Sequence, residues 1–180
     1  MPSGISNPKF SKLLFSREQT RLIHGIEIRG SAEFQQRSGE ALALLHTLDE
    51  FALIRAHLHI LRQGKRSGMR ARRARATFTV GAPTWGHSAL WYAGAIAHDA
   101  YHAKLYRDAE LARPALQPCA DDWTGAAAEK ACLGFQRSVL AALDAAPTML
   151  AYIDSQWQNP AYQGRNHGWG SWLDYRKRWW

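Results

Sequence analysis

The segment 86–108 constrains the fold most, because it combines a long apolar helix with two histidines on one side. Its sequence, GHSALWYAGAIAHDAYHAKLYRD, places His98 and His102 four residues apart. Side chains at this spacing project from the same face of a helix. Two imidazoles placed in this way can bind one metal ion through their ring nitrogens.

The rest of the chain is also mostly helical in pattern. From 31 to 63 apolar residues recur at steps of three and four, which predicts one long helix with Ser31 as its N-cap and Gly64 as its end. Thr124 is expected to cap a helix over 125–143. Pro147 suits the first turn of a further helix over 148–156.

Strand signals are few. ATFTV at 76–80 predicts a short strand ended by Gly81, and another strand is expected at 22–28. Length and pattern together predict a single α+β domain over 1–180 that is predominantly helical. It is expected to begin with an irregular segment (1–30), a long helix (31–63) and an Arg-rich loop (64–75). A metal-site core (76–145) and a C-terminal helix with a Trp-rich tail (146–180) are expected to follow.

The net charge of +8 comes from one segment. Residues 62–75 carry seven basic side chains and no acid: Arg62, Lys65, Arg66, Arg70, Arg72, Arg73 and Arg75. A uniformly basic nucleic-acid coat is therefore not expected. Three interpretations stay open for the tract, namely a solvated loop, a contact with nucleic acid or an anionic membrane, and a surface for an acidic partner.

Composition limits the remaining classes of protein. We expect no transmembrane segment and no signal peptide, so the protein is expected in the cytoplasm or exported without a classical signal. Cys119 and Cys132 form no CxxC pair, which argues against a zinc site made of thiolates. They are either two free thiols or one disulfide. Four tryptophans in the last twelve residues indicate that the tail packs on the domain.

A third ligand for the metal has to come from another element. Glu129 is the predicted one, because it shares a helix stripe with Cys132, Leu133 and Gln136. That stripe is the apolar face, where an acid is costly unless it is paired or ligating.

The set HDAYH, followed by a helix with EKACLGFQ, resembles the zincin-like metallopeptidases of the gluzincin type over about residues 76–143. The resemblance implies a zinc ion held by His98, His102 and Glu129, with Asp99 at the general-base position. It also implies a zincin-like core in which 76–80 is a short edge strand of the sheet that lies at the edge of the cleft and aligns peptide substrates. The sequence departs from the family at Asp99, which is one methylene shorter than the usual glutamate.

The stretch GAIAHDAYH is also similar to the signature of HD-domain phosphohydrolases, in which adjacent His and Asp side chains bind metal. That resemblance would use His98 and Asp99, with further ligands from upstream histidines and downstream aspartates. The candidates are His57, His59, Asp144 and Asp154. That family is all helical, which a strand at 76–80 does not fit.

Several side chains could assist hydrolysis by donating hydrogen bonds to an oxyanion. Tyr101 is predicted as a catalytic residue because it lies near the ligand face of its helix, and Tyr92 and His87 are further candidates. The predicted function is zinc-dependent hydrolysis of a peptide or protein substrate by metal-activated water. The alternatives are an HD-type phosphohydrolase and a non-catalytic protein that binds an acidic partner through the Arg-rich loop.

Overall fold

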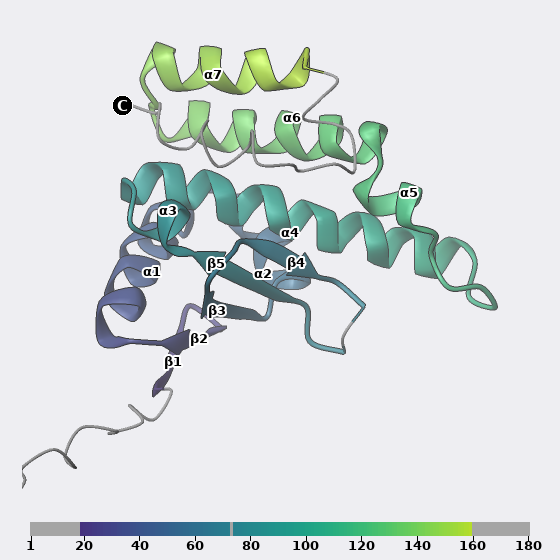
Figure 1. The fold of residues 1–180 in the computed structure, drawn as a ribbon, viewed down its shortest axis with the longest axis horizontal. Coiled ribbons are helices and arrows are strands. Elements are labelled where there is room, and N and C mark those ends of the chain that lie inside the picture. The colour runs from purple at the N-terminus through teal and green to yellow at the C-terminus, as the bar shows by residue number, and fades with distance from the viewer. Residues whose placement is uncertain (1–18, 73, 160–180) are drawn as a thin grey trace, which may run out of the picture.

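The computed structural model describes residues 19–72 and 74–159, in which seven helices pack with a five-stranded mixed sheet (Figure 1). The strands are β1 (Gln19–Ile23), β2 (Ile26–Gly30), β3 (Ile60–Gly64), β4 (Gly68–Arg70) and β5 (Thr77–Gly81). The helices are α1 (Ala32–Leu45), α2 (Phe51–His57), α3 (Ala82–Trp85), α4 (Ala89–Ala112), α5 (Ala120–Thr124), α6 (Ala126–Ala142) and α7 (Pro147–Trp157). The predicted α+β class with predominantly helical content is confirmed.

The sheet has the strand order β1-β2-β3-β5-β4. The three central strands are parallel, and the strand at each edge pairs antiparallel with its neighbour. The register aligns Ile28 with Leu61 and Leu61 with Phe78, and all three side chains are buried. Because side chains alternate across a strand, this register gives the sheet one continuous apolar face.

The helices cover that apolar face and stack on one another. The side chains of α1, α2 and α4 join Ile28, Leu61 and Phe78 in one core cluster. Figure 1 shows α4 lying across the sheet, α6 lying over α4, and α7 lying over α6. The approach of α4 to α6 is close at Gly94, where a Cβ atom would lie 3.0 Å from the side chain of Leu140. Helix α4 is therefore enclosed between the sheet and α6.

Several helix boundaries follow the predicted signals. The Ser31 side chain accepts a hydrogen bond from the Phe34 amide at the start of α1, as an N-cap does. The predicted helix 86–108 is α4, which begins after the N-cap Ser88. Pro147 occupies the first turn of α7, where its missing N–H costs nothing.

The prediction of one long helix over 31–63 is wrong, because this span contains α1, α2 and β3. After α1 the chain turns, and the Thr47 hydroxyl donates to the Leu44 carbonyl oxygen. Leu58 is extended, and the following residues pair with β2 and β5. Gly64 therefore ends a strand. Sheet pairing overrides helical spacing here, since Leu58 fits the helical spacing with Leu61 and the two-residue period of a strand with Ile60.

The N-terminal part of the described chain is a β-hairpin, where a single strand over 22–28 and otherwise irregular structure were expected. His24 and Gly25 form the turn with φ of 49° and 85°. A two-residue hairpin turn of type I′ has positive φ at both central residues, which glycine adopts without strain. Ile23 then pairs with Ile26 across the turn.

The strand expected at 76–80 exists as β5, but its predicted place at the sheet edge is wrong. It lies between β3 and β4. The covering strand β4 comes from the segment 64–75, which was expected to be a loop throughout. Of that segment, Arg73 lies outside the described residues.

The expected cap at Thr124 is wrong, and the expected packing of the Trp-rich tail falls outside the described residues. Thr124 does not cap the third predicted helix, because it ends α5 and Gly125 occupies the N-cap position of α6. The Thr124 hydroxyl instead donates to the Ala120 carbonyl oxygen within α5. The predicted packing of the Trp-rich tail concerns residues 160–180, which lie outside the described part of the chain.

Candidate metal centre

Helix α4 presents His98 and His102 to α6, as their four-residue spacing predicted. Both side chains are buried, with 8% and 6% of the residue surface exposed. Their Nε2 atoms face each other at 3.1 Å. The two imidazoles therefore converge on one point between the helices.

Helix α6 contributes Glu129 to the same point. One carboxylate oxygen lies 3.4 Å from His98 Nε2, and the other lies 3.4 Å from His102 Nε2. The Glu129 side chain is only 12% exposed. The structure thus brings together the three residues predicted as metal ligands.

The orientation of both rings is fixed through their other nitrogens. His98 Nδ1 lies 3.1 Å from Gln136 Oε1, and His102 Nδ1 lies 2.6 Å from the carbonyl oxygen of Trp123. Both oxygens are acceptors, so each Nδ1 donates its hydrogen and each Nε2 is the nitrogen that can bind a metal once it carries no proton. Metal-binding histidines are held in this way, with the second nitrogen donating to a carbonyl or carboxylate.

The distances in this cluster suit a zinc ion. Two atoms bound at ~2.05 Å in tetrahedral geometry lie about 3.3 Å apart. The measured separations of 3.1 and 3.4 Å between Nε2 atoms and between Nε2 and carboxylate oxygens are close to this value. Nitrogen and carboxylate oxygen are also ligands that zinc accepts. The residues present therefore fit the ion that the sequence implies.

Cys132 is a further donor that the sequence analysis did not select. It lies one turn beyond Glu129 on α6 and is fully buried. Its sulfur and one ligand nitrogen from each of His98 and His102 all lie within 4.8 Å of one another. Its place three residues after Glu129 on the inward stripe was the signal that could have identified it.

Burial and close charges shift the pKa values of the cluster. Burial lowers the pKa of His102, but its contacts with Cys132 and Glu129 outweigh burial and raise the value to about 11. Burial acts to raise the pKa of Glu129, yet the two imidazoles hold it well below its ordinary value. Burial raises the pKa of the Cys132 thiol. The cluster therefore holds a proton on His102 and a carboxylate on Glu129.

Asp99 stands beside the cluster. It is half-buried, and burial raises its pKa to about 6 although His98 and His102 oppose the shift. Its electrostatic interactions with both histidines and with Glu129 place its carboxyl group near the ligand set. Its assignment as general base stays a prediction.

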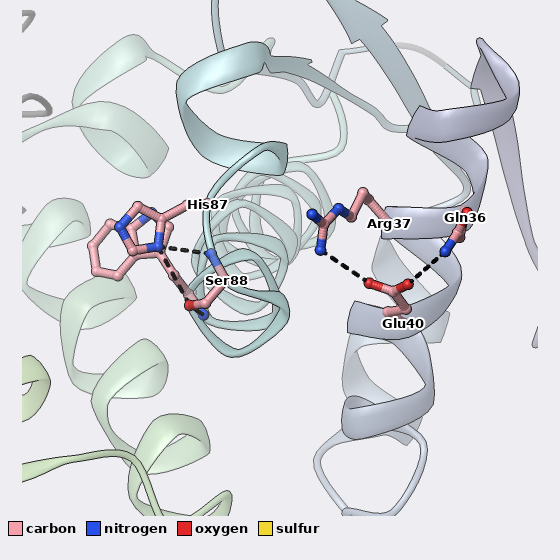
Figure 2. A network of polar contacts seen from close by, with 6 residues as sticks. Gln36, Arg37, Glu40, His87 and Ser88 are labelled. Atoms are coloured by element: carbon pink, nitrogen blue, oxygen red, sulfur yellow. Dashed lines mark hydrogen bonds and ion pairs between the residues drawn. The ribbon is translucent and has the colours of Figure 1, made fainter. Parts of the chain in front are cut away.

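The other candidates for oxyanion stabilisation have contacts elsewhere. The Tyr101 ring packs against Phe135 with ring centres 5.0 Å apart, so its catalytic role stays a prediction. Tyr92 is buried and hydrogen-bonds with Ser38 of α1. Figure 2 shows His87 beside Ser88 at the start of α4, where its Nδ1 accepts from the Ser88 amide at 2.7 Å.

The ligand set expected for an HD-type site does not come together. Asp154 binds Arg137 through two hydrogen bonds of 2.6 and 3.1 Å. Within residues 19–72 and 74–159, the close group of three metal-ligating side chains contains none of His57, His59 and Asp144. The strand β5 also contradicts the all-helical arrangement on which that interpretation depends.

Comparison with known proteins adds no relative: no family model, no curated protein and no solved structure matches the chain. None of the helices in the described residues is long and apolar enough to cross a membrane.

Proposed function

We propose that this protein is a zinc-dependent hydrolase in which His98, His102 and Glu129 hold the ion. The observation that supports the proposal is the convergence of both Nε2 atoms on the Glu129 carboxylate. Hydrogen bonds from both Nδ1 atoms orient the rings toward that point. A buried carboxylate is costly unless a metal cation or a proton on a neighbouring imidazole compensates its charge.

The proposed reaction is hydrolysis of a peptide bond. A zinc ion would polarise the carbonyl group and lower the pKa of its water toward ~7. Asp99 is assigned as the base that accepts the proton of that water, because it lies next to His98 and beside the ligand set. Since aspartate is one methylene shorter than glutamate, Asp99→Glu should retain hydrolysis and Asp99→Asn should lose it.

Zinc content tests the ligand set. Protein purified without added metal should hold about one zinc per chain, and His98→Ala and Glu129→Ala should each lose it. His57→Ala is the control, because His57 is a histidine of α2 outside the cluster. Full zinc in both ligand variants would overturn the proposed site. Loss of zinc in His57→Ala would favour the HD-type alternative.

Hydrolysis tests the chemistry separately from binding. Asp99→Asn should keep its zinc and cleave a fluorogenic peptide mixture far more slowly than the unaltered protein. General bases contribute about 10²- to 10⁴-fold to such reactions, which sets the expected loss. Equal rates in the two zinc-loaded proteins, both above the rate of the zinc-free protein, would remove Asp99 from the mechanism.

The Arg-rich segment is the proposed source of a preference for acidic peptides. Arg66 and Arg70 are exposed and line a pocket of about 220 Å³. The neighbouring Ala71 is buried in one cluster with Trp123, whose carbonyl oxygen binds His102. The basic side chains are thus anchored next to the helix that supports the site.

A paired substrate comparison tests this preference. The double variant Arg66→Gln, Arg70→Gln should slow turnover of acidic peptides more than that of neutral peptides, and the difference should shrink with added salt. Arg37→Gln on α1 is the control for loss of a surface charge. Equal effects on both peptide classes would leave these arginines as solvated surface charges without a role in substrate preference.

A further inference from the structure

Cys132 lies close enough to both histidines to serve as a fourth ligand of the site. It follows Glu129 by three residues and precedes Gln136 by four, so all three side chains lie on one face of α6. Glu129 contacts both imidazoles, and Gln136 orients His98. The sulfur between them is fully buried and close to both histidines.

We propose that Cys132 closes the zinc site as a fourth ligand, so that the resting protein is a latent hydrolase that opens when the sulfur leaves. This inference depends on the proposed zinc site. When zinc binds, the S–H bond breaks, an S–Zn bond forms and the proton passes to solvent. When the site opens, the S–Zn bond breaks and the sulfur takes a proton back from solvent.

Closed and open zinc sites differ in how many of the four ligands the protein supplies. Four protein ligands are typical of structural sites, whereas a hydrolytic site keeps one position for water. His98, His102 and Glu129 alone leave that position free. The Cys132 sulfur lies where it can occupy it, since thiolate ligates zinc at about 2.3 Å.

The second cysteine provides a matched control. Cys119 is exposed and precedes α5, where its side chain accepts from a backbone amide of the first turn. It takes no part in the three-ligand group found among the described residues. Cys119→Ser therefore changes a thiol without changing the proposed ligand set.

Cobalt substitution measures both coordination by sulfur and openness of the site. In the unaltered chain and in Cys119→Ser, bound Co²⁺ should show thiolate-to-cobalt absorption in the near ultraviolet, and azide should leave the visible bands unchanged. Cys132→Ala and Cys132→Ser should keep about one cobalt per chain, lose the ultraviolet absorption and respond to azide. Peptide hydrolysis by zinc-loaded Cys132→Ala should exceed that of the unaltered protein.

The outcomes separate the two proposals. If the unaltered protein binds one Co²⁺ without thiolate absorption, the role of Cys132 is overturned and the zinc site stands. If it binds neither Co²⁺ nor Zn²⁺, the proposed function fails. Should the Cys132 variants not fold, X-ray absorption of the zinc-loaded natural sequence decides: a sulfur neighbour at about 2.3 Å supports the inference, and nitrogen and oxygen neighbours alone overturn it.

Discussion

Gln136 offers the sharpest test of the metal centre, because it touches a ligand without being one. Its Oε1 atom accepts the hydrogen of His98 Nδ1 at 3.1 Å, and the residue is only 4% exposed. Gln136→Leu replaces this acceptor with a side chain of similar size. The volume of the core is nearly preserved, so the substitution removes mainly one hydrogen bond.

The expected cost falls on the zinc-bound protein. Without zinc, His98 can move its hydrogen to Nε2 and donate it to Glu129, which avoids an unsatisfied donor. Zinc binding requires the lone pair of Nε2, so in the Gln136→Leu variant the hydrogen returns to Nδ1 and faces an apolar side chain without an acceptor. A buried unsatisfied donor costs about 1–3 kcal/mol. At about 1.4 kcal/mol per factor of ten, zinc affinity should fall about 5- to 150-fold.

A competition titration against a chromophoric chelator at fixed pH measures this change. Gln156→Leu on α7 is the matched control, because Gln156 is also buried and its amide donates to Ser155 away from the centre. It should leave zinc affinity unchanged. If Gln136→Leu folds and binds zinc as tightly as the natural protein, then His98 does not bind zinc through Nε2 and the assigned geometry is wrong.

Three further predictions test the electrostatics and the packing around the site. The pKa of His102 is raised to about 11, so zinc must displace a proton from this residue when it binds. The apparent affinity for zinc should therefore rise about tenfold per pH unit for each displaced proton between pH 6 and 8. Titration calorimetry in buffers of different ionisation enthalpy measures the number of protons released. Hydrogen bonding from Arg29 outweighs the opposing effect of burial and lowers the pKa of Glu27 from 4.5, so its stabilisation is present above pH 4.5 and declines as the pH falls through the lowered pKa. In denaturant titrations, Glu27→Gln should cost about 1 kcal/mol at pH 7 and progressively less below pH 4.5. Gly94→Ala should lower the free energy of unfolding by about 1–3 kcal/mol, because the new Cβ meets the buried Leu140 side chain at 3.0 Å. Gly134→Ala has its nearest contact at 3.5 Å and should raise the free energy of unfolding by up to about 1 kcal/mol. Thermal unfolding of both variants tests this, and a change in the same direction for both would refute the packing argument.

The helices with local start signals could be predicted from the sequence. Ser31, Ser88 and Pro147 act through hydrogen bonds or φ restrictions within the first turn, so their effects do not depend on the rest of the fold. The span 31–63 could not be divided correctly, because Leu58 fits a helix with Leu61 and a strand with Ile60. Residues 60–64 form a strand because β3 pairs with β2 and β5, which are distant from it in the sequence.

The metal ligands divide in the same way. His98 and His102 could be predicted because one helix sets their relation, and Glu129 because an acid on an apolar stripe requires a partner. The Trp123 carbonyl oxygen could not be predicted, since it becomes an acceptor for His102 only through the placement of α5. Cys132 was visible on the same stripe, but its distance from both histidines depends on how closely α4 and α6 approach.

That dependence links metal binding to helix packing. The ligands proposed for the centre all come from α4 and α6, which approach closely at Gly94 and Leu140. Zinc that binds only the packed helices would stabilise the fold by about 4.1 kcal/mol at a thousand times its dissociation constant. A substitution that merely separates the helices would then lower zinc affinity as if a ligand had been lost. Gly94→Ala should therefore weaken zinc binding and also lower the stability of the zinc-free protein. Gln136→Leu should weaken zinc binding but leave the stability of the zinc-free protein almost unchanged. This difference identifies Gln136 as a residue that acts through the metal ligands.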